Sequence, residues 1–415
     1  MLAEAKELDR SDPLGGFRDR FAIDDRELIY LNGNSLGRMP LAAAERLREA
    51  AEDEWACGLS RSWSSRWMEL PSRIGAKIAR LIGAGEDEVL VADATTVNVY
   101  KLALAALSHL SDRSEVVADD SNFPSDVHAL EACCRQRGCK LLLAPAHEAR
   151  GAAPEEIERL LGNRTALLSL AHTAFKSGAV HDMPRLTEAA HRVGALAMWD
   201  LSHSVGAVPV NLNGCGADLA VGCCYKYLNG GPGAPAFLFV RRDLQGSLEN
   251  PIWGWLGSLD PFGFGLGFEA APGIRRFQVG TPPVLSLAAM EPGVDMILDA
   301  GMSRIRGKST LLSELLRRIW ERDLRAHGFD WNSPDDLERR GSHVALKHPE
   351  AFRICRALIE IQRVVPDFRA PDNIRFGLSP LSTSFVEVFE ATVRLKRVVE
   401  GRLYEGISEE RTAVT

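Results

Sequence analysis

The sequence predicts an α/β fold: a large domain built on a mostly parallel sheet covered by helices, followed by a smaller α+β domain. Three observations lead to this prediction. Short, almost continuously apolar runs such as 165–172 are typical of strands buried on both faces. Amphipathic helical segments separate these runs, as the connections of a parallel sheet require. Past about residue 285 the pattern changes to charged helices and a half-exposed strand.

The first two-thirds of the chain alternates between helical periodicity and apolar runs. Proline favours the first turn of a helix, and Pro40 and Pro71 mark two helix starts. Apolar periodicity predicts helices over 41–57, 71–83, 97–110, 125–137, 154–161 and 184–193. Apolar runs predict strands over 115–119, 140–145, 165–172, 196–200 and 234–240.

The last third has a different layout. A long charged amphipathic helix is expected over 302–327, and "SHVALKH" (342–348) alternates like a half-exposed strand. Further elements are a strand at 374–380 and helices at 349–359 and 385–400. We therefore expect three parts: an N-terminal segment (1–60) that joins the small domain, a large domain (61–290) and a small C-terminal α+β domain (291–415).

Composition excludes several classes of function. The 415 residues carry a net charge of −7, which argues against nucleic acid or an anionic membrane as a partner. No apolar run approaches the roughly 18 residues that span a bilayer. The charged N-terminus, "MLAEAKELDRSDP", lacks the apolar core of a secretory signal, so a cytoplasmic protein is expected.

The cysteine pattern indicates neither a disulfide framework nor a metal site. Eight cysteines are few for a chain of this length, and no C-x-x-C spacing occurs. Cys133–Cys134 and Cys223–Cys224 are adjacent pairs in apolar surroundings. Buried free thiols, which pack as small hydrophobic side chains, are the expected state.

One lysine stands in an unusual place. Lys226 lies between two tyrosines in "YKYLNGGPG" (225–233), directly before a glycine-rich turn. The run before it (214–224) is apolar apart from Asp218, and the run after it (234–240) is an expected strand. A lysine delivered into an apolar interior has a lowered pKa and suits Schiff-base chemistry, although it could instead extend its ammonium to solvent.

Other polar side chains follow the predicted strands. Ligands of doubly wound sheets bind beyond the carboxyl ends of the strands. The residues expected there are Thr95, Thr96, Phe123, Ser125, Asp126, Asp200, His203, Tyr225 and Lys226. Each has an ordinary alternative: threonines and aspartates cap helices and turns, Phe123 could pack on the core, and His203 could be a buried structural histidine. Their joint order favours pyridoxal 5′-phosphate, which needs a lysine, a carboxylate for the pyridine nitrogen, a stacking ring and a phosphate site.

At this point the sequence resembles the kynureninase family, within the type I (aspartate-aminotransferase-like) class of pyridoxal-phosphate enzymes. The resemblance covers nearly the whole chain. Its specific motifs are "NGNSLG" (32–37), "ADATTVN" (92–98), "FPSD" (123–126), "WDLSHSVGAVPV" (199–210), "CCYKYLNGGPG" (223–233), "GWLG" (254–257), "FQVGTPPVLSL" (277–287) and "FRAPDNIRFGLSPL" (368–381). The resemblance implies the type I fold of that class, with a mostly parallel seven-stranded sheet, and a homodimer with shared active sites.

The resemblance also implies roles for individual residues. Lys226 binds the cofactor aldehyde, Asp200 pairs with the pyridine nitrogen and Tyr225 contacts the phosphate, which also makes Tyr225 the candidate proton donor. The other implied cofactor contacts are Thr95, Thr96, Phe123, Ser125, Asp126 and His203, with Trp255 and Thr281 reaching in from the neighbouring subunit. The implied substrate contacts are Arg375, as a bidentate clamp on the α-carboxylate, and Ser35, Asn34 and Trp63, around the aromatic ketone. A surface salt bridge is the alternative for Arg375, and its apolar neighbours Ile374 and Phe376 disfavour it.

The implied reaction is hydrolysis of the Cβ–Cγ bond of L-kynurenine or 3-hydroxykynurenine. The sequence departs from the family pattern at Ala171, where a hydroxyl is expected, and at Ser382, where a tyrosine is expected. These departures affect the expected substrate preference more than the reaction class. A kynurenine with another ring substituent, a cysteine desulfurase or transaminase activity, and a non-catalytic cofactor-binding regulator are the alternatives. No basic helix-turn-helix segment supports the last of these.

Overall fold

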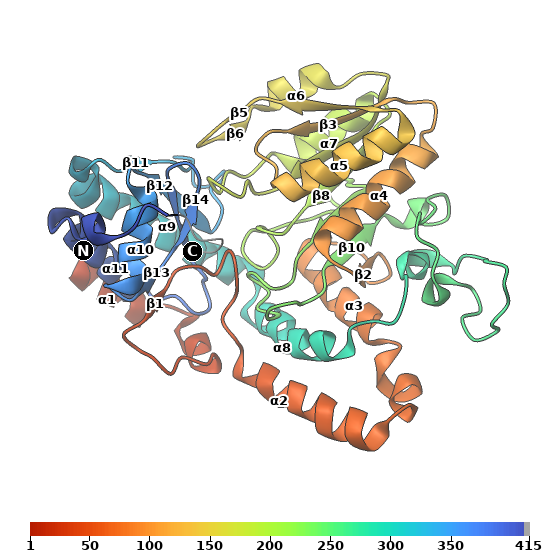
Figure 1. The fold of residues 1–415 in the computed structure, drawn as a ribbon, viewed down its shortest axis with the longest axis horizontal. Coiled ribbons are helices and arrows are strands. Elements are labelled where there is room, and N and C mark those ends of the chain that lie inside the picture. The colour runs from red at the N-terminus through yellow and green to blue at the C-terminus, as the bar shows by residue number, and fades with distance from the viewer. Residues whose placement is uncertain (411–415) are drawn as a thin grey trace.

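A computed structural model describes residues 1–410 of the chain. The molecule has two lobes, and both termini belong to the smaller one (Figure 1). The large lobe holds a seven-stranded sheet in the order β2-β10-β9-β8-β7-β3-β4. Its strands are β2 (Val89–Val91), β3 (Glu115–Asp119), β4 (Lys140–Ala144), β7 (Thr165–Ala171), β8 (Leu196–Asp200), β9 (Leu219–Gly222) and β10 (Phe237–Val240). Every pairing is parallel except the two made by β10, which confirms the predicted sheet.

Helices cover both faces of this sheet, as the apolar strands require. Two separate hydrophobic clusters lie on the two faces, one containing side chains of α4 and α5 and the other side chains of α3, α6, α7 and α8. The bounds of these helices are α3 (Leu70–Ile82), α4 (Thr95–His109), α5 (Pro124–Arg137), α6 (Pro154–Leu160), α7 (Met183–Arg192) and α8 (Val284–Ala300). A short hairpin, β5 (Ala146–His147) with β6 (Gly151–Ala152), follows β4.

The small lobe is built on a four-stranded antiparallel sheet in the order β11-β12-β15-β14. The strands are β11 (Asp330–Trp331), β12 (His343–Lys347), β14 (Asp367–Arg369) and β15 (Asn373–Gly377). The helices are α1 (Leu2–Arg10), α9 (Met302–Ile319), α10 (Ala351–Glu360) and α11 (Phe385–Glu400). α11 begins with a capping box formed by Ser384 and Glu387. The N-terminal strand β1 (Ile29–Tyr30) pairs in parallel with β13 (Val364–Val365), which ties the two ends of the chain together.

Several elements differ from those that periodicity predicts. The expected helix 41–57 is α2 (Leu41–Glu49) continued by a π-helical segment (Ala50–Gly58), and the expected helix 302–327 ends its regular α geometry at Ile319. α1 and α8 were not expected. α8 is apolar on most of its faces and carries Pro292 inside it, so neither its periodicity nor its composition indicates an exposed helix.

The N-terminal 60 residues divide between the lobes. α1 and β1 pack on the small lobe, whereas α2 packs on α8, which itself packs on α3 of the large lobe. The expected boundary at residue 290 falls inside α8. We therefore propose placing α2 and α8 with the large lobe. Among residues 1–410, no helix combines the length and apolar character that crossing a bilayer requires.

Candidate active site

A cavity of about 270 Å³ lies at the carboxyl ends of the sheet strands, where the two lobes meet. It brings together most of the side chains that the sequence singled out. Its lining consists of Asn34, Ser35, Ala94, Thr95, Thr96, Phe123, Ser125, Asp126, Asp200, Ser202, His203, Tyr225, Lys226, Ala234, Ala236, Arg369 and Arg375. Residues far apart in sequence meet here because parallel strands present their carboxyl ends at one edge of the sheet.

Lys226 lies in the turn that follows β9, and its amine points at the cavity. Its Nζ is 3.1 Å from Nε2 of His203 and 6.0 Å from the ring centroids of Phe123 and Tyr225. The turn is held by the "NGNSLG" motif, since the Gly37 amide donates to the Tyr225 carbonyl. A Cβ on Gly37 would lie 2.3 Å from the Lys226 carbonyl oxygen, so only glycine allows this approach. The two most specific motifs of the sequence are therefore in direct contact.

Two buried carboxylates share the floor of the cavity. Asp200 ends β8, and its Oδ1 accepts a hydrogen bond from the Ser202 amide at 2.8 Å. Asp126 lies in the first turn of α5. Burial, together with the neighbouring Asp200 carboxylate, raises the pKa of Asp126 well above its ordinary value. The two side chains therefore place a proton-holding carboxyl group next to the carboxylate that ends β8.

Two helix N-termini converge on the same cavity. α4 begins at Thr95 and α5 at Pro124, neither helix has a side-chain cap, and residues of both first turns line the cavity. The hydroxyls of Thr96 and Ser125 lie 2.5 Å apart and link the two helix starts. Aligned amides, helix dipoles and hydroxyls together form a site for a small anion such as a phosphate group.

A buried ion pair braces this anion site, and sequence reasoning missed it. Lys101 is fully buried, and its Nζ donates to Asp93 Oδ2 and to the Phe277 carbonyl, both at 2.7 Å. Asp93 lies two residues before the first residue of α4 and has a positive φ of 52°, a left-handed conformation that its short side chain tolerates. The sequence feature that could have indicated this ion pair is Lys101 itself, a lysine among the apolar residues of an expected helix.

Burial keeps the histidine beside the lysine neutral. It lowers the pKa of His203 well below its usual value, and the charge of Lys226 lowers it further. The His203 ring also lies 5.2 Å from the buried ring of His343 on β12. A neutral His203 can accept a hydrogen bond from the lysine ammonium. The pKa of the Tyr225 phenol is raised by the charge of the neighbouring Cys223 and by burial, so Tyr225 keeps its proton.

The small-lobe wall of the cavity is a β-hairpin with a buried ion pair. Arg375 is 1% exposed, and its Nε and Nη2 donate to the two carboxylate oxygens of Asp367 at 2.9 and 2.6 Å. Asp367 and Arg375 are directly opposite each other in the β14–β15 register. Nη2 also donates to Ser35 Oγ at 3.1 Å. The guanidinium therefore faces the cavity as expected, but its forked edge already holds an internal carboxylate.

Asn34 has no hydrogen-bond partner for its side chain among the described residues. It is fully buried, and both its Oδ1 and its Nδ2 lack a partner. Because an unpaired buried amide is costly, and Asn34 lines the cavity, its amide suits contact with a bound molecule. Arg369, on β14, also lines the cavity and was missed by sequence reasoning. The sequence feature that could have indicated Arg369 is the motif "FRAPDNIR" (368–375), whose hairpin turn brings both of its arginines to the cavity.

Three of the expected site residues lie elsewhere in the chain. Trp63 and Thr281 line a separate, mostly apolar cavity of about 400 Å³, next to Trp55 and Trp67. Trp255 lines a third cavity within the loop 253–269. A single chain therefore does not bring these three side chains to Lys226. Trp255 and Thr281 were expected to act on the neighbouring subunit, which a single chain does not test.

The two departures from the family pattern belong to different lobes, and neither residue lines the cavity. Ala171 ends β7 directly opposite Asp200, and its amide donates to Asn122 Oδ1 at 2.6 Å. The missing hydroxyl at this position removes a donor beside Asp200. Ser382 is buried in the small lobe, where its carbonyl accepts a hydrogen bond from Arg18.

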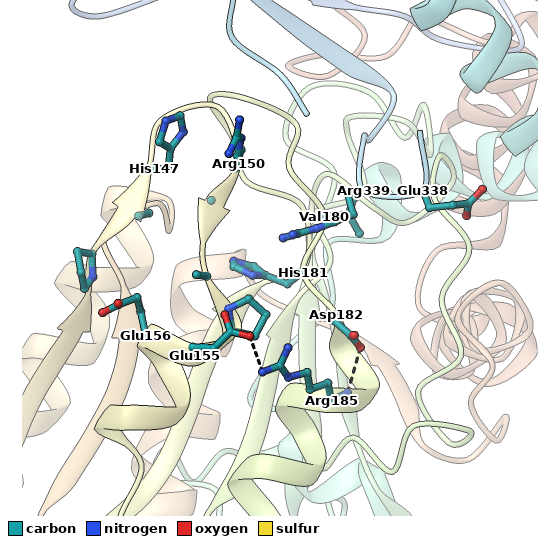
Figure 2. Close-up of a pocket in the computed structure, with 15 residues that line it drawn as sticks. His147, Arg150, Glu155, Glu156, Val180, His181, Asp182, Arg185, Glu338 and Arg339 are labelled. Atoms are coloured by element: carbon teal, nitrogen blue, oxygen red, sulfur yellow. Dashed lines mark hydrogen bonds and ion pairs between the residues drawn. The ribbon is translucent and has the colours of Figure 1, made fainter. Parts of the chain in front are cut away.

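A larger cavity, of about 830 Å³, lies between the β5–β6 hairpin, the start of α7 and residues 338–339 of the small lobe (Figure 2). Two of its charged side chains, Arg185 and Glu155, pair with each other at 2.7 Å. It contains none of the residues expected to carry chemistry, and no lysine lines it. Size alone therefore does not identify the active site in this molecule.

Comparison with known proteins gives a consistent result. Residues 34–352 match the family model described as "Aminotransferase class-V". The chain is 40% identical over 404 residues to the kynureninase of Pseudomonas fluorescens, covering 96% of this chain and 95% of that protein. The same values hold for the kynureninase of Burkholderia mallei. Among solved structures, it resembles a cysteine desulfurase from Thermococcus onnurineus (TM-score 0.77, 18% identity, 95% of this chain and 98% of that chain). It also resembles the cysteine desulfurase CsdA of Escherichia coli (TM-score 0.78, 17% identity, 93% and 98%), a likeness of fold alone.

Proposed function

The chain belongs to the kynureninase family within the class-V aminotransferases, and from this premise we propose that it hydrolyses the side chain of L-kynurenine or 3-hydroxykynurenine. One water is consumed, the Cβ–Cγ bond breaks, and the products are anthranilate or 3-hydroxyanthranilate and L-alanine. The enzyme is thus a hydrolase of carbon–carbon bonds in ketonic substances, and its cofactor is pyridoxal 5′-phosphate. The observation that carries the proposal is that Lys226 and Asp200 face one cavity together with two uncapped helix N-termini.

The residues of the cavity fit this cofactor. The converging starts of α4 and α5, with the hydroxyls of Thr96 and Ser125, suit its phosphate. Asp200 offers a buried carboxylate for the pyridine nitrogen, and the exposed face of Phe123 (42% exposed) can stack on the ring. Lys226 has no carboxylate within ion-pair distance in the described part of the chain, so its amine is available to the aldehyde.

The cofactor, when bound, supplies an electron sink next to the substrate α-carbon. The chain's own residues handle the protons and hold the substrate. Lys226, with neutral His203 beside it, takes the α-proton and returns it elsewhere on the substrate. Asp200 keeps the ring nitrogen protonated. Tyr225, whose pKa is raised, supplies a proton to the three-carbon fragment that leaves as alanine. Arg375 holds the α-carboxylate, while Asn34 and Ser35 contact the rest of the substrate.

We also propose that the enzyme is a cytoplasmic homodimer with shared sites, in which Trp255 and Thr281 of the partner subunit reach the cofactor phosphate. Large apolar side chains support an interface on the loop 253–269, where Phe262, Phe264 and Leu266 are 58%, 83% and 107% exposed. All eight cysteines are free thiols, as a reducing compartment favours. Sedimentation of the purified protein is expected to give a dimer, and Trp255→Ala is expected to weaken cofactor retention. A stable monomer with a normal affinity for the cofactor would contradict this arrangement.

Product assays separate the proposal from the related activities. Anthranilate fluorescence should appear when the holoenzyme is mixed with L-kynurenine, whereas cysteine should release no sulfide. A desulfurase needs a cysteine that reaches the cofactor, and no cysteine of residues 1–410 lines the Lys226 cavity. Side-by-side kcat/KM values for kynurenine and 3-hydroxykynurenine identify the preferred ring. Sulfide release without anthranilate formation would overturn the proposal.

A further inference from the structure

The two arginines on the small-lobe wall are in different states. Arg375 is almost saturated: Nε and Nη2 donate to Asp367, Nη2 donates to Ser35, and Nη1 donates to the Phe175 carbonyl. A guanidinium has five N–H donors, so one N–H of Arg375 remains for a ligand. A bidentate grip on a second carboxylate would require Arg375 to release the buried Asp367. The substrate carboxylate therefore needs a further donor.

Arg369 has donors to spare. Its side chain is 33% exposed, with Nη2 2.9 Å from Asp367 Oδ2 and Nη1 donating to the Phe368 carbonyl at 2.9 Å. Its Nε has no partner among the described residues, and its side chain lines the same cavity as Lys226. Because Asp367 contacts both arginines, it holds the two guanidinium groups side by side on the cavity wall.

The charges of this wall match a monoanion. Two guanidinium groups and one carboxylate leave a net charge of +1 facing the cavity. On the large-lobe side, the cavity instead presents Lys226 beside the carboxyl groups of Asp126 and Asp200. An amino acid fits this distribution when its α-carboxylate points to the small lobe and its amine to the large lobe. Arg369 is not needed to hold the hairpin together, because Arg375 and Asp367 already join its two strands through two hydrogen bonds.

We propose that Arg369 is the second binding residue for the substrate α-carboxylate, which it holds together with the one remaining N–H of Arg375. This inference rests on the proposed function, because it takes the ligand to be an α-amino acid. It assigns substrate recognition to a residue on β14, next to the arginine on β15 that the sequence already indicated. A ligand without the carboxylate charge gains nothing from Arg369.

The test compares Arg369→Gln and Arg369→Lys with the parent holoenzyme. Arg322→Gln is a matched control, since Arg322 is an exposed small-lobe arginine that also lies beside an aspartate (Asp323). Loss of a charge-assisted contact should raise KM for L-kynurenine about tenfold to a hundredfold in Arg369→Gln, with kcat changed less than about threefold. Arg369→Lys keeps the positive charge but loses the planar guanidinium, so its KM should lie between those of the parent and Arg369→Gln.

Calorimetry supplies a readout that does not depend on turnover. L-Homophenylalanine, an amino acid without the ketone, should bind Arg369→Gln about tenfold or more weakly than the parent, while its α-carboxamide should bind both equally. Arg322→Gln should match the parent in every measurement. Unchanged KM and unchanged homophenylalanine affinity in Arg369→Gln would overturn the inference while leaving the proposed function intact. A parent enzyme that binds homophenylalanine but forms no anthranilate would instead refute the proposed function alone. If Arg369→Gln does not fold, Arg369→Lys decides: a KM equal to that of the parent would overturn the inference.

Discussion

The two walls of the active-site cavity are built on opposite principles. The large-lobe wall leaves polar groups open: α4 and α5 start without side-chain caps, and Lys226 contacts a neutral histidine instead of a carboxylate. The small-lobe wall pairs its buried arginine internally: Arg375 is held by both oxygens of Asp367, and Arg369 is the arginine that keeps donors for a ligand. Both walls come from the same chain and face the same cavity.

Because of this difference, the two walls should respond differently to substitution: one in ligand binding and chemistry, the other also in folding stability. Open polar groups at the edge of a preformed sheet cost little stability there, because water or a ligand can pair with them, so substitutions are expected to change chemistry and affinity. A buried ion pair is part of the fold, and removing one partner leaves the other charge buried and unpaired. Substitutions on the large-lobe wall should therefore affect the reaction, and those on the small-lobe wall should affect stability as well.

The largest effect is expected at Lys226. Lys226→Ala should abolish detectable kynurenine hydrolysis and the visible absorption band of the lysine-bound cofactor, since no other amine lines the cavity. The free energy of unfolding of the cofactor-free protein should stay within about 0.5 kcal/mol of the parent, as for surface substitutions. Lys140→Ala, at an exposed lysine of β4, is the control. Retention of the band would refute the assignment of Lys226.

On the opposite wall, Arg375→Leu should lower the free energy of unfolding by about 2–3 kcal/mol, because the buried Asp367 carboxylate keeps only the partly exposed Arg369 and Ser35 as partners. Denaturant unfolding of the cofactor-free protein measures this loss. The double variant Arg375→Leu with Asp367→Leu should recover much of the stability, since the one charge that loses its partner, Arg369, is partly exposed to water. A loss below about 1 kcal/mol in the single variant would contradict the contrast between the walls.

The pH dependence of stability tests the layer behind the small-lobe wall. Burial lowers the pKa of His343 to about 3 from 6.5, so the folded state keeps it neutral while the unfolded chain binds a proton below pH 6.5. Its contribution is present above pH 6.5 and is lost as the pH falls towards 3, at up to about 1.4 kcal/mol per pH unit. His343→Gln should therefore make the decline in stability between pH 6.5 and 5 shallower. His109→Gln, at an exposed histidine, should leave the slope unchanged.

The smallest effect is expected at the proposed phosphate site. Thr96→Val removes one hydroxyl but keeps the α4 amides, so the dissociation constant of the cofactor should rise about fivefold, the equivalent of about 1 kcal/mol. Titration of the cofactor-free protein measures it, and the unfolding free energy without cofactor should not change. Thr310→Val, on α9 of the small lobe, is the control. A large loss of unfolding free energy in Thr96→Val would contradict the contrast between the large-lobe wall and the small-lobe wall.

Much of the large-lobe wall was predictable because its logic is local. Apolar runs identify β7 and β8, and residues directly after parallel strands, such as Asp200, must lie at one edge of the sheet. The small-lobe wall was not predictable in the same way. Arg375 was expected to offer both arms of its fork to the substrate, yet the β14–β15 register places Asp367 opposite it. Register depends on turn geometry and on which faces are buried, and a single sequence pattern does not reveal either.

By itself, the sequence determined the alternation of strands and helices, the change of layout in the last third of the chain and the placing of Lys226 and Asp200 at one edge of the sheet, since each follows from a period or from the order of residues along the chain. Only the tertiary structure decided the pairing of β1 with β13, the antiparallel course of β10 and the separation of Trp63 and Thr281 from Lys226. The physical reason is the range of the interactions. Periodicity reports which face of an element is buried, but the partner that buries it can lie hundreds of residues away.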